Sequence, residues 1–280
     1  MKMKHILIPT DFSDNAWNAL TYGIELFQKT KCTFYVMHIN TIPRYTGAGT
    51  SVKRASGKLA DTLLKDSMEN LNALIARTKE LPLKTEHTFV PLAFYSHFTD
   101  TVKGVVETKN IDLIIMGTKG ATGAKEVLFG SNTANIIKKS KCTVIAIPLH
   151  SAYKKPEEIL FPTDYEIQYE KETFHQLLDI VKAYTSSVNV LHVSTGYDLT
   201  QEQEKNKQQL KKLLGSSSVF HNVPDNSVIT AVNEFQVNTP VDLIVMVQNK
   251  HTFMERLFNE PIIKKIGFHV TVPFMVIPQL

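Results

Sequence analysis

The sequence predicts an α/β protein made of two tandem halves, each a parallel β-sheet with crossover helices. Three observations lead to this fold class. Short β-branched runs alternate with longer segments of helical periodicity, as in parallel sheets whose strands are joined by helices. The chain has 280 residues, which at about 150 residues per domain fits two domains. The order of the runs is also repeated once along the chain, which indicates an internal duplication.

The duplication is clearest where each half begins and where it ends. Residues 6–11 (ILIPTD) return as residues 159–164 (ILFPTD), at an offset of 153 residues. Residues 111–116 (IDLIIM) return as residues 241–246 (VDLIVM), at an offset of 130 residues. The second half is therefore shorter than the first in its middle by 23 residues, the difference between the two offsets.

The first half divides into predicted elements in chain order. Ser13 is expected to cap a first helix, because apolar residues follow it at helical spacing. A second helix is expected from Gly57, with Leu59 and Leu71 on its buried face, and a third over residues 98–108. The predicted strands are 5–8, 33–39, 85–90, 112–116 and 143–147, of which the last two are almost wholly apolar, as in strands buried on both faces.

Domain boundaries and cellular compartment follow from composition. We expect one domain at 1–150 and a second at 156–280, joined by a short polar linker that lets the halves touch. Hydrophobic residues make up 43% and charged residues 21%, with a net charge of +4, so the chain reads as globular, with no argument for nucleic acid. No apolar run approaches the roughly 18 residues of a membrane span. Cys32 and Cys142 lie in apolar runs, so we expect them to be buried free thiols rather than part of a disulfide framework. This is typical of a protein in the reducing cytoplasm.

A glycine-rich segment follows the fourth predicted strand. It contains Gly117, Gly120, Gly123 and Gly130 and ends in Ser131, where a helix is expected to begin. Glycine lets the backbone approach a ligand closely, and a helix N-terminus offers free N–H groups and a positive dipole end to an anion. The segment therefore predicts a phosphate-binding loop rather than glycines that merely serve turns. It is neither a Walker A loop nor the dinucleotide-binding pattern of glycines.

The motifs together point to a known family. The spacing G-x2-G-x9-G-S from Gly117 to Ser131, the residues PTDFS at 9–13 and the strand end His38-Ile39 resemble the universal stress protein family. The resemblance covers both halves as a tandem. It implies that each half is a Rossmann-like, five-stranded parallel sheet flanked by helices, of the adenine nucleotide α hydrolase-like type. It also implies adenine nucleotide binding in members that carry this glycine motif.

The ligand that the resemblance implies is ATP, with or without Mg²⁺, or another adenine nucleotide. Thr10 and Asp11 would lie by the base and ribose, with Ile39 against the adenine. Asp11 can accept a hydrogen bond from a ribose hydroxyl, and Ser131 can donate one to a phosphate oxygen. Asp11 could at the same time be a turn or helix-capping residue. No catalytic or metal-ligating residue is assigned, and the nucleotide-binding candidates are Pro9, Thr10, Asp11, Ile39, Met116, Gly117, Gly120, Gly130, Ser131 and Asn132.

Other polar residues favour simpler roles. Lys119 and Lys125 could neutralise phosphate charge, but exposed loop lysines are common and this role is not favoured. His38 and His192 end strands at matching positions and are expected to be partly buried, hydrogen-bonded histidines. We find no zinc-ligand spacing and no nucleophile elbow in the sequence.

The sequence favours a regulatory protein over an enzyme. The first hypothesis is a cytoplasmic, ATP-binding stress-response protein in which the nucleotide acts as a conformational or assembly switch. The alternative is a slow ATP-hydrolysing or nucleotidyl-transferring enzyme. Phosphoryl transfer needs a metal anchor and a positioned base or charged clamp, for which Asp11 alone is thin support. A scaffold that binds another anion or a lipid-like ligand in the second half is a third possibility.

The second half is expected to have lost the nucleotide site. At the offset of 130 residues, the motif glycines and serine become Val247, Lys250, Glu260 and Pro261. A carboxylate would stand where phosphate would bind, and proline supplies no N–H. We therefore expect nucleotide binding in the first half alone, and a structural or partner-binding role for the second.

The last strand of each half predicts how the halves assemble. Residues 144–147 and 274–277 are apolar and would be sheet edges, which invite pairing. We expect the two edges to pair within the chain, with a homodimer and an unidentified protein partner left open, and neither nucleic acid nor membrane as a partner.

Overall fold

The computed structural model describes residues 3–41, 57–83, 85–118, 130–194, 197–224, 228–248 and 272–279. The first half contains β1 (Lys4–Pro9), α1 (Asp14–Leu26), β2 (Cys32–Thr41), α2 (Gly57–Thr78), β3 (Thr88–Ser96), α3 (Phe98–Thr108), β4 (Leu113–Gly117), α4 (Ser131–Lys139) and β5 (Thr143–Ile147). The second half contains β6 (Glu158–Pro162), α5 (Lys171–Tyr184), β7 (Ser187–Ser194), α6 (Gln201–Leu214), the 3₁₀ turn η1 (Gly215–Ser217), β8 (Ser218–Pro224), α7 (Val228–Asn238), β9 (Leu243–Gln248) and β10 (Phe274–Pro278).

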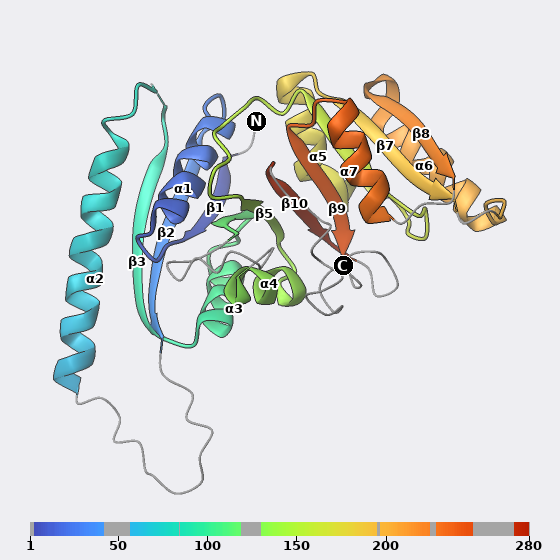
Figure 1. Cartoon of the computed structure of the whole chain (residues 1–280). Helices are drawn as coiled ribbons and strands as arrows, with labels where there is room; N and C mark the ends of the chain where they lie inside the picture. Colours follow the sequence, from blue (N-terminus) through green and yellow to red (C-terminus); the bar gives the residue numbers. More distant parts are fainter. Residues whose placement is uncertain are drawn as a thin grey trace, which may run out of the picture.

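The strands form one continuous ten-stranded sheet in the order β3-β2-β1-β4-β5-β10-β9-β6-β7-β8 (Figure 1). Each half contributes five parallel strands, with its first strand in the centre, so the predicted tandem α/β fold class is confirmed. In the first half β1 lies between β2 and β4, so the strand order reverses at β1. Ligands of open α/β sheets collect at this kind of reversal.

The two half-sheets join through their last strands. β5 and β10 run antiparallel, with Ile145 opposite Met275 at the centre of the pairing. Each strand thereby covers the apolar edge of the other, which removes the exposed edge that an isolated half would present. This edge is consequently not available for pairing with a second copy of the chain.

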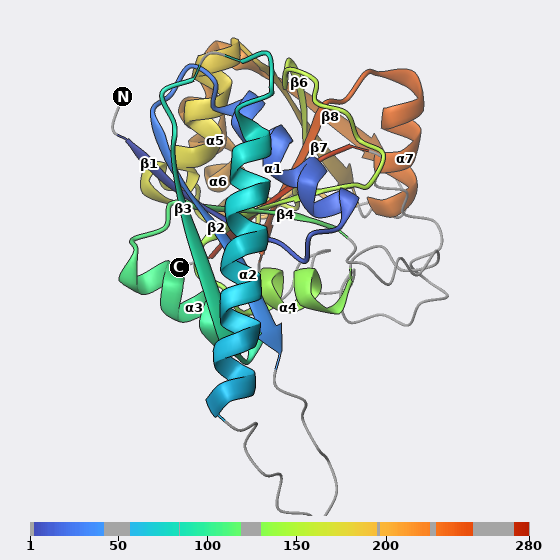
Figure 2. The ribbon, with the colours of Figure 1, turned by 90° about the vertical axis from the view of Figure 1, so that its left-hand side faces the viewer.

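Helices cover both faces of the sheet and create two cores. One core packs α1, α2, α5 and α6 on one face, and the other packs α3, α4 and α7 on the opposite face. Figure 2 views the sheet from its α2 end, with α2 in front of β2 and β3. Both cores run through both halves, so burial of apolar area holds the halves together as one body.

Two predicted features differ from the structure. The strand expected at 85–90 begins at Thr88 and runs on through Pro91 to Ser96. Among the described strands β3 pairs with β2 alone, and an edge strand tolerates proline because the missing N–H can face away from its neighbour. Leu71 is fully buried on α2 as expected, but Leu59 is 51% exposed because the start of α2 extends past the end of β3 (Figure 1).

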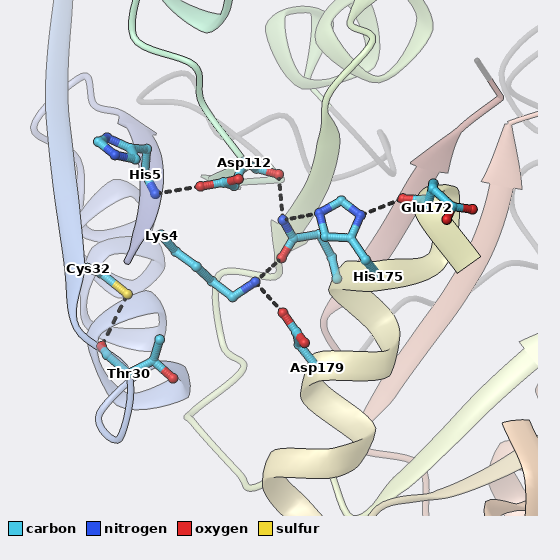
Figure 3. Close-up of polar contacts among 9 residues, drawn as sticks. Lys4, His5, Thr30, Cys32, Asp112, Glu172, His175 and Asp179 are labelled. Atoms are coloured by element: carbon cyan, nitrogen blue, oxygen red, sulfur yellow. Dashed lines mark hydrogen bonds and ion pairs between the residues drawn. The ribbon is translucent and has the colours of Figure 1, made fainter. Parts of the chain in front are cut away.

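Polar contacts also tie the halves together (Figure 3). The Lys4 ammonium at the start of β1 forms a 2.6 Å ion pair with Asp179 on α5 and donates a 2.7 Å hydrogen bond to Gln176 Oε1. Gln176 Nε2 donates in turn to the Asp112 carbonyl at 3.1 Å. Lys4 is 6% exposed, so its buried charge forms an ion pair that links the two halves.

Candidate functional site

The turn after β1 is held by its own side chains. Thr10 is buried, and its N–H donates to the Met37 carbonyl at 2.8 Å, which extends the β1–β2 register into the turn. Asp11 is exposed, and its Oδ1 accepts from Ser13 N at 3.1 Å and from Ser13 Oγ at 2.6 Å. Ser13 Oγ accepts from Ala16 N, so Ser13 is the N-cap of α1, as predicted. Asp11 thus acts as a turn residue while its carboxylate stays at the surface.

The end of β4 is built around Gly117. A Cβ at this position would lie 2.5 Å from Asn15 Nδ2 and 3.2 Å from the Asn15 carbonyl oxygen on α1. The Gly117 carbonyl accepts from Thr133 Oγ1 of α4 at 2.8 Å. Gly117 therefore brings the first turns of α1 and α4 together at the end of β4. Its lack of a side chain is explained by helix packing, without reference to a ligand.

The start of α4 offers backbone N–H groups at the same place. Gly130 is the N-cap residue, with φ −59° and ψ 157°, and as a glycine it supplies no side-chain cap to the helix. Gly130 N donates to the Thr118 carbonyl at 2.6 Å, which ties the start of the helix to the end of β4. Ser131 and Asn132 are exposed in the first turn. Uncapped first-turn N–H groups and the positive dipole end are suited to binding an anion.

The described candidate residues gather at the end of the sheet where the parallel strands β1 and β4 terminate. Pro9, Thr10 and Asp11 end β1 or follow it, and Gly117 ends β4. Ile39 and Met116 are buried, 8% and 5% exposed, in the core that packs α3 and α4. Gly130, Ser131 and Asn132 start α4, whereas Gly120, Lys119 and Lys125 lie outside the described residues.

The second half repeats the turn and adds hydrogen bonds to it, with Thr163 and Asp164 half-buried. Thr163 N donates to the Leu191 carbonyl at 2.9 Å, matching the bond of Thr10, and Asp164 Oδ1 accepts from Glu166 N at 3.1 Å. Here, however, Thr163 Oγ1 shares a 2.5 Å hydrogen bond with the buried hydroxyl of Tyr169.

Helix α6 also packs onto the second turn. Gln203 Nε2 donates to the Asp164 carbonyl at 3.0 Å, and Asn206 Nδ2 donates to the Tyr165 carbonyl at 2.9 Å. Tyr165 is 2% exposed, and burial raises the pKa of its hydroxyl to about 12. Our sequence reasoning missed these residues. For Tyr169 the available signal was the longer connection, since six residues (165–170) separate Asp164 from α5 and two (12–13) separate Asp11 from α1; Gln203 and Asn206 carried no such signal.

The described residues contain neither a metal-binding cluster nor a membrane-spanning helix. No group of three or more His, Cys, Asp or Glu side chains lies together in a way that could hold a metal ion. Within the same ranges, no helix combines the length and the apolar character that crossing a membrane requires.

The fold defines an α/β protein with two Rossmann-like halves. The chain belongs to the universal stress protein family, whose family model matches residues 2–148. It is therefore a stress-response protein of that family.

Individual relatives resemble about half of the chain. The universal stress protein MJ0531 of Methanocaldococcus jannaschii is 27% identical over 164 residues, which is 55% of this chain and 84% of that protein. The universal stress protein MJ0577 of the same organism is 27% identical over 157 residues, 51% of this chain and 94% of that protein.

Solved structures resemble the whole chain. A universal stress protein from Archaeoglobus fulgidus has a TM-score of 0.64 and 16% identity, covering 98% of this chain and 96% of that one. The protein PA1789 from Pseudomonas aeruginosa has a TM-score of 0.58 and 11% identity over 98% and 92% of the two chains. At these identities the similarity establishes the fold of both halves.

Proposed function

We propose that this chain is a cytoplasmic regulatory protein that binds one adenine nucleotide, ATP or a close relative, in its first half. The nucleotide would lie between the turn at 9–13 and the N-terminus of α4, and would act as a conformational or assembly switch. The observation that carries the proposal is the start of α4 at Gly130. This helix begins beside the reversal of strand order with a glycine as its N-cap, and with Ser131 exposed.

The chemistry of the edge suits a nucleotide. First-turn N–H groups and the Ser131 hydroxyl can donate to phosphate oxygens, and the helix dipole favours negative charge there. The exposed Asp11 carboxylate can accept from a ribose hydroxyl, since a carboxylate accepts several hydrogen bonds. Apolar Ile39 and Met116 lie in the core beneath these polar groups and are 8% and 5% exposed, so the base would contact only the small exposed part of each.

Binding by the first half alone is supported by contacts in the second. Thr163 and Asp164 keep the turn, but Tyr169 bonds to the Thr163 hydroxyl, and Gln203 and Asn206 of α6 bond to the backbone carbonyls of Asp164 and Tyr165. A nucleotide at this turn would have to displace contacts that the chain already makes. The second half would then serve as a structural or partner-binding unit, with homodimerisation through a surface other than the paired β5 and β10 edges.

Calorimetric titration of the whole chain with ATP, ADP and AMP tests the proposal. We expect a stoichiometry near one nucleotide per chain. Gly130→Val places a side chain where phosphate would approach, at a backbone conformation that valine adopts readily. Ser131→Asp sets a carboxylate against the phosphates. Either change should lower the affinity on the order of a hundredfold or more.

Ser131→Asp carries an internal control for folding. An aspartate in the first turn of a helix is favourable for helix stability, so this variant should unfold no earlier than the wild type while it loses the nucleotide. Asp164→Ala, the second-half counterpart of Asp11→Ala, should leave the affinity unchanged. Two sites per chain, or wild-type affinity in both α4 variants, would overturn the proposal. Steady-state phosphate release abolished by Asp11→Ala would replace binding with catalysis.

A further inference from the structure

We propose that His38, at the end of β2, is a positioning residue that holds the turn carrying Thr10 and Asp11 in its binding conformation. The inference rests on the proposed function for its consequence, nucleotide affinity. Its physical content, the shape of the turn, can be measured without any ligand.

The imidazole of His38 makes two contacts with the turn. Its Nδ1 lies 2.8 Å from the Thr10 carbonyl oxygen. A carbonyl can only accept, so Nδ1 is the nitrogen that carries the proton. The His38 ring also lies against Phe12, with ring centroids 4.5 Å apart and planes tilted by 33°. The His38 side chain thus contacts both Thr10, which precedes Asp11, and Phe12, which follows it.

The second contact supports a strained residue. Phe12 has a φ of 63°, in the left-handed region that a non-glycine residue seldom adopts. Such residues persist where their surroundings hold them in place. Phe12 N also donates to Thr10 Oγ1 at 3.0 Å, which closes the turn on itself. The position of Asp11 is therefore fixed from both sides, by a left-handed neighbour and an anchored carbonyl.

The second half repeats the same arrangement. His192 Nδ1 lies 3.0 Å from the Thr163 carbonyl oxygen, and the His192 ring stacks on Tyr165 at a centroid distance of 4.9 Å and an angle of 28°. Tyr165 has a φ of 58°. The combination of histidine, anchored carbonyl and left-handed aromatic residue therefore occurs twice. This indicates that the histidine shapes the turn in both halves, whether or not a ligand binds there.

The duplication supplies a matched control for the experiment. His38→Phe keeps a flat ring beside Phe12 but removes the N–H donor. His38→Asn keeps a donor near the position of Nδ1 but removes the ring. His192→Phe makes the donor-removing change at the turn where no nucleotide is proposed to bind. The readouts are ADP affinity and stoichiometry by calorimetry, and hydrogen exchange at the backbone amides of Phe12 and Ser13.

We expect His38→Phe to weaken ADP binding about tenfold or more with unchanged stoichiometry, and to speed exchange at both amides. His38→Asn should recover part of the affinity, and His192→Phe should keep it within about twofold of the wild type. A wild-type affinity in His38→Phe would overturn the proposal, as would an equal loss in His192→Phe. A fall in stoichiometry alone would mean that His38 only stabilises the fold.

The two proposals fail in distinguishable ways. If the wild type binds no adenine nucleotide, the proposed function is wrong, and hydrogen exchange still decides the role of His38. Faster exchange at Phe12 and Ser13 in His38→Phe but not in His192→Phe would then support positioning. Unchanged exchange would refute it. If His38→Phe does not fold, His38→Asn is compared with the wild type by the same two measurements.

Discussion

Replacing Gly117 with alanine tests whether helix packing sets the need for glycine at the end of β4. The new Cβ would lie 2.5 Å from Asn15 Nδ2, 2.7 Å from Asn15 Cγ and 3.2 Å from the Asn15 carbonyl oxygen. Real Cβ atoms do not approach other atoms within 3.0 Å, so Asn15 has to move. Asn15 is only 2% exposed, so its side chain has little room to turn away, and the 3.2 Å contact with its backbone carbonyl also requires a shift of a few tenths of an ångström in α1.

The expected effect follows from two opposing terms. Overpacking of this kind costs about 1–3 kcal/mol. Gly117 does not have a left-handed φ, so alanine meets no backbone strain and gains about 0.4–1 kcal/mol by restricting the unfolded chain. The net expectation is a loss of about 1–2 kcal/mol in the free energy of unfolding. Nucleotide affinity should fall too, because the first turns of α1 and α4 meet at this residue.

Gly104 provides the matched control. A Cβ there meets nothing within 4 Å, and the residue lies inside helix α3, where alanine is better than glycine by about 0.5–1 kcal/mol. Urea unfolding followed by circular dichroism should therefore show a lower midpoint for Gly117→Ala and a higher one for Gly104→Ala. If Gly117→Ala is as stable as the wild type, the packing argument is wrong, and ligand contact remains the reason for glycine.

Three further predictions concern buried groups. Burial beside Phe34 lowers the pKa of His87 from 6.5, so the unfolded chain binds a proton more readily than the folded chain does. The free energy of unfolding should therefore fall as pH drops through about 6.5. Urea unfolding at a series of pH values should show a weaker pH dependence for His87→Phe. Burial raises the pKa of the Cys32 and Cys142 thiols to about 12, so both should react with a thiol reagent only after denaturation; rapid labelling of the native chain would contradict this. Asp179→Asn leaves the Lys4 ammonium buried without its counter-charge and should lower the free energy of unfolding by roughly 1–3 kcal/mol. Lys4→Met should cost less, because the Asp179 carboxylate that it leaves unpaired is 40% exposed and can be hydrated. Thermal unfolding compares the two variants, and the reverse order of stability would refute the argument.

The fold was largely predictable because the repeat and the hydrophobic pattern agree. The residues ILIPTD and ILFPTD mark the first strand of each half, and both strands lie at the centre of their half-sheets. The apolar runs at 112–116 and 143–147 correspond to β4 and β5, which are almost wholly buried. Strand ends were harder to predict. β3 continues through Pro91, and only its place at the edge of the sheet makes that proline acceptable.

The candidate site was predictable as a location but less so in its details. The sequence indicates that the turn after β1 and the start of α4 belong to one edge, and the described residues gather there. It cannot show that Gly117 is shaped by Asn15, because this contact joins residues about a hundred positions apart. The longer segment before α5 indicates that the second turn differs from the first, but it cannot show that the Tyr169 hydroxyl bonds to Thr163.

The comparison of the two turns indicates which features are diagnostic of a nucleotide site. Both halves keep Thr-Asp after the central strand, a left-handed aromatic residue and a histidine on the carbonyl. These features therefore accompany the fold and cannot by themselves identify a binding half. What distinguishes the halves is the glycine and serine at the start of α4, together with an exposed Asp11 as against a half-buried Asp164 whose backbone carbonyl is bonded by α6. A tandem chain of this kind should then bind as many nucleotides as it has halves with both a glycine-serine helix start and an exposed aspartate turn. For this chain that number is one, and a calorimetric stoichiometry of two would show that the second turn opens for ligand.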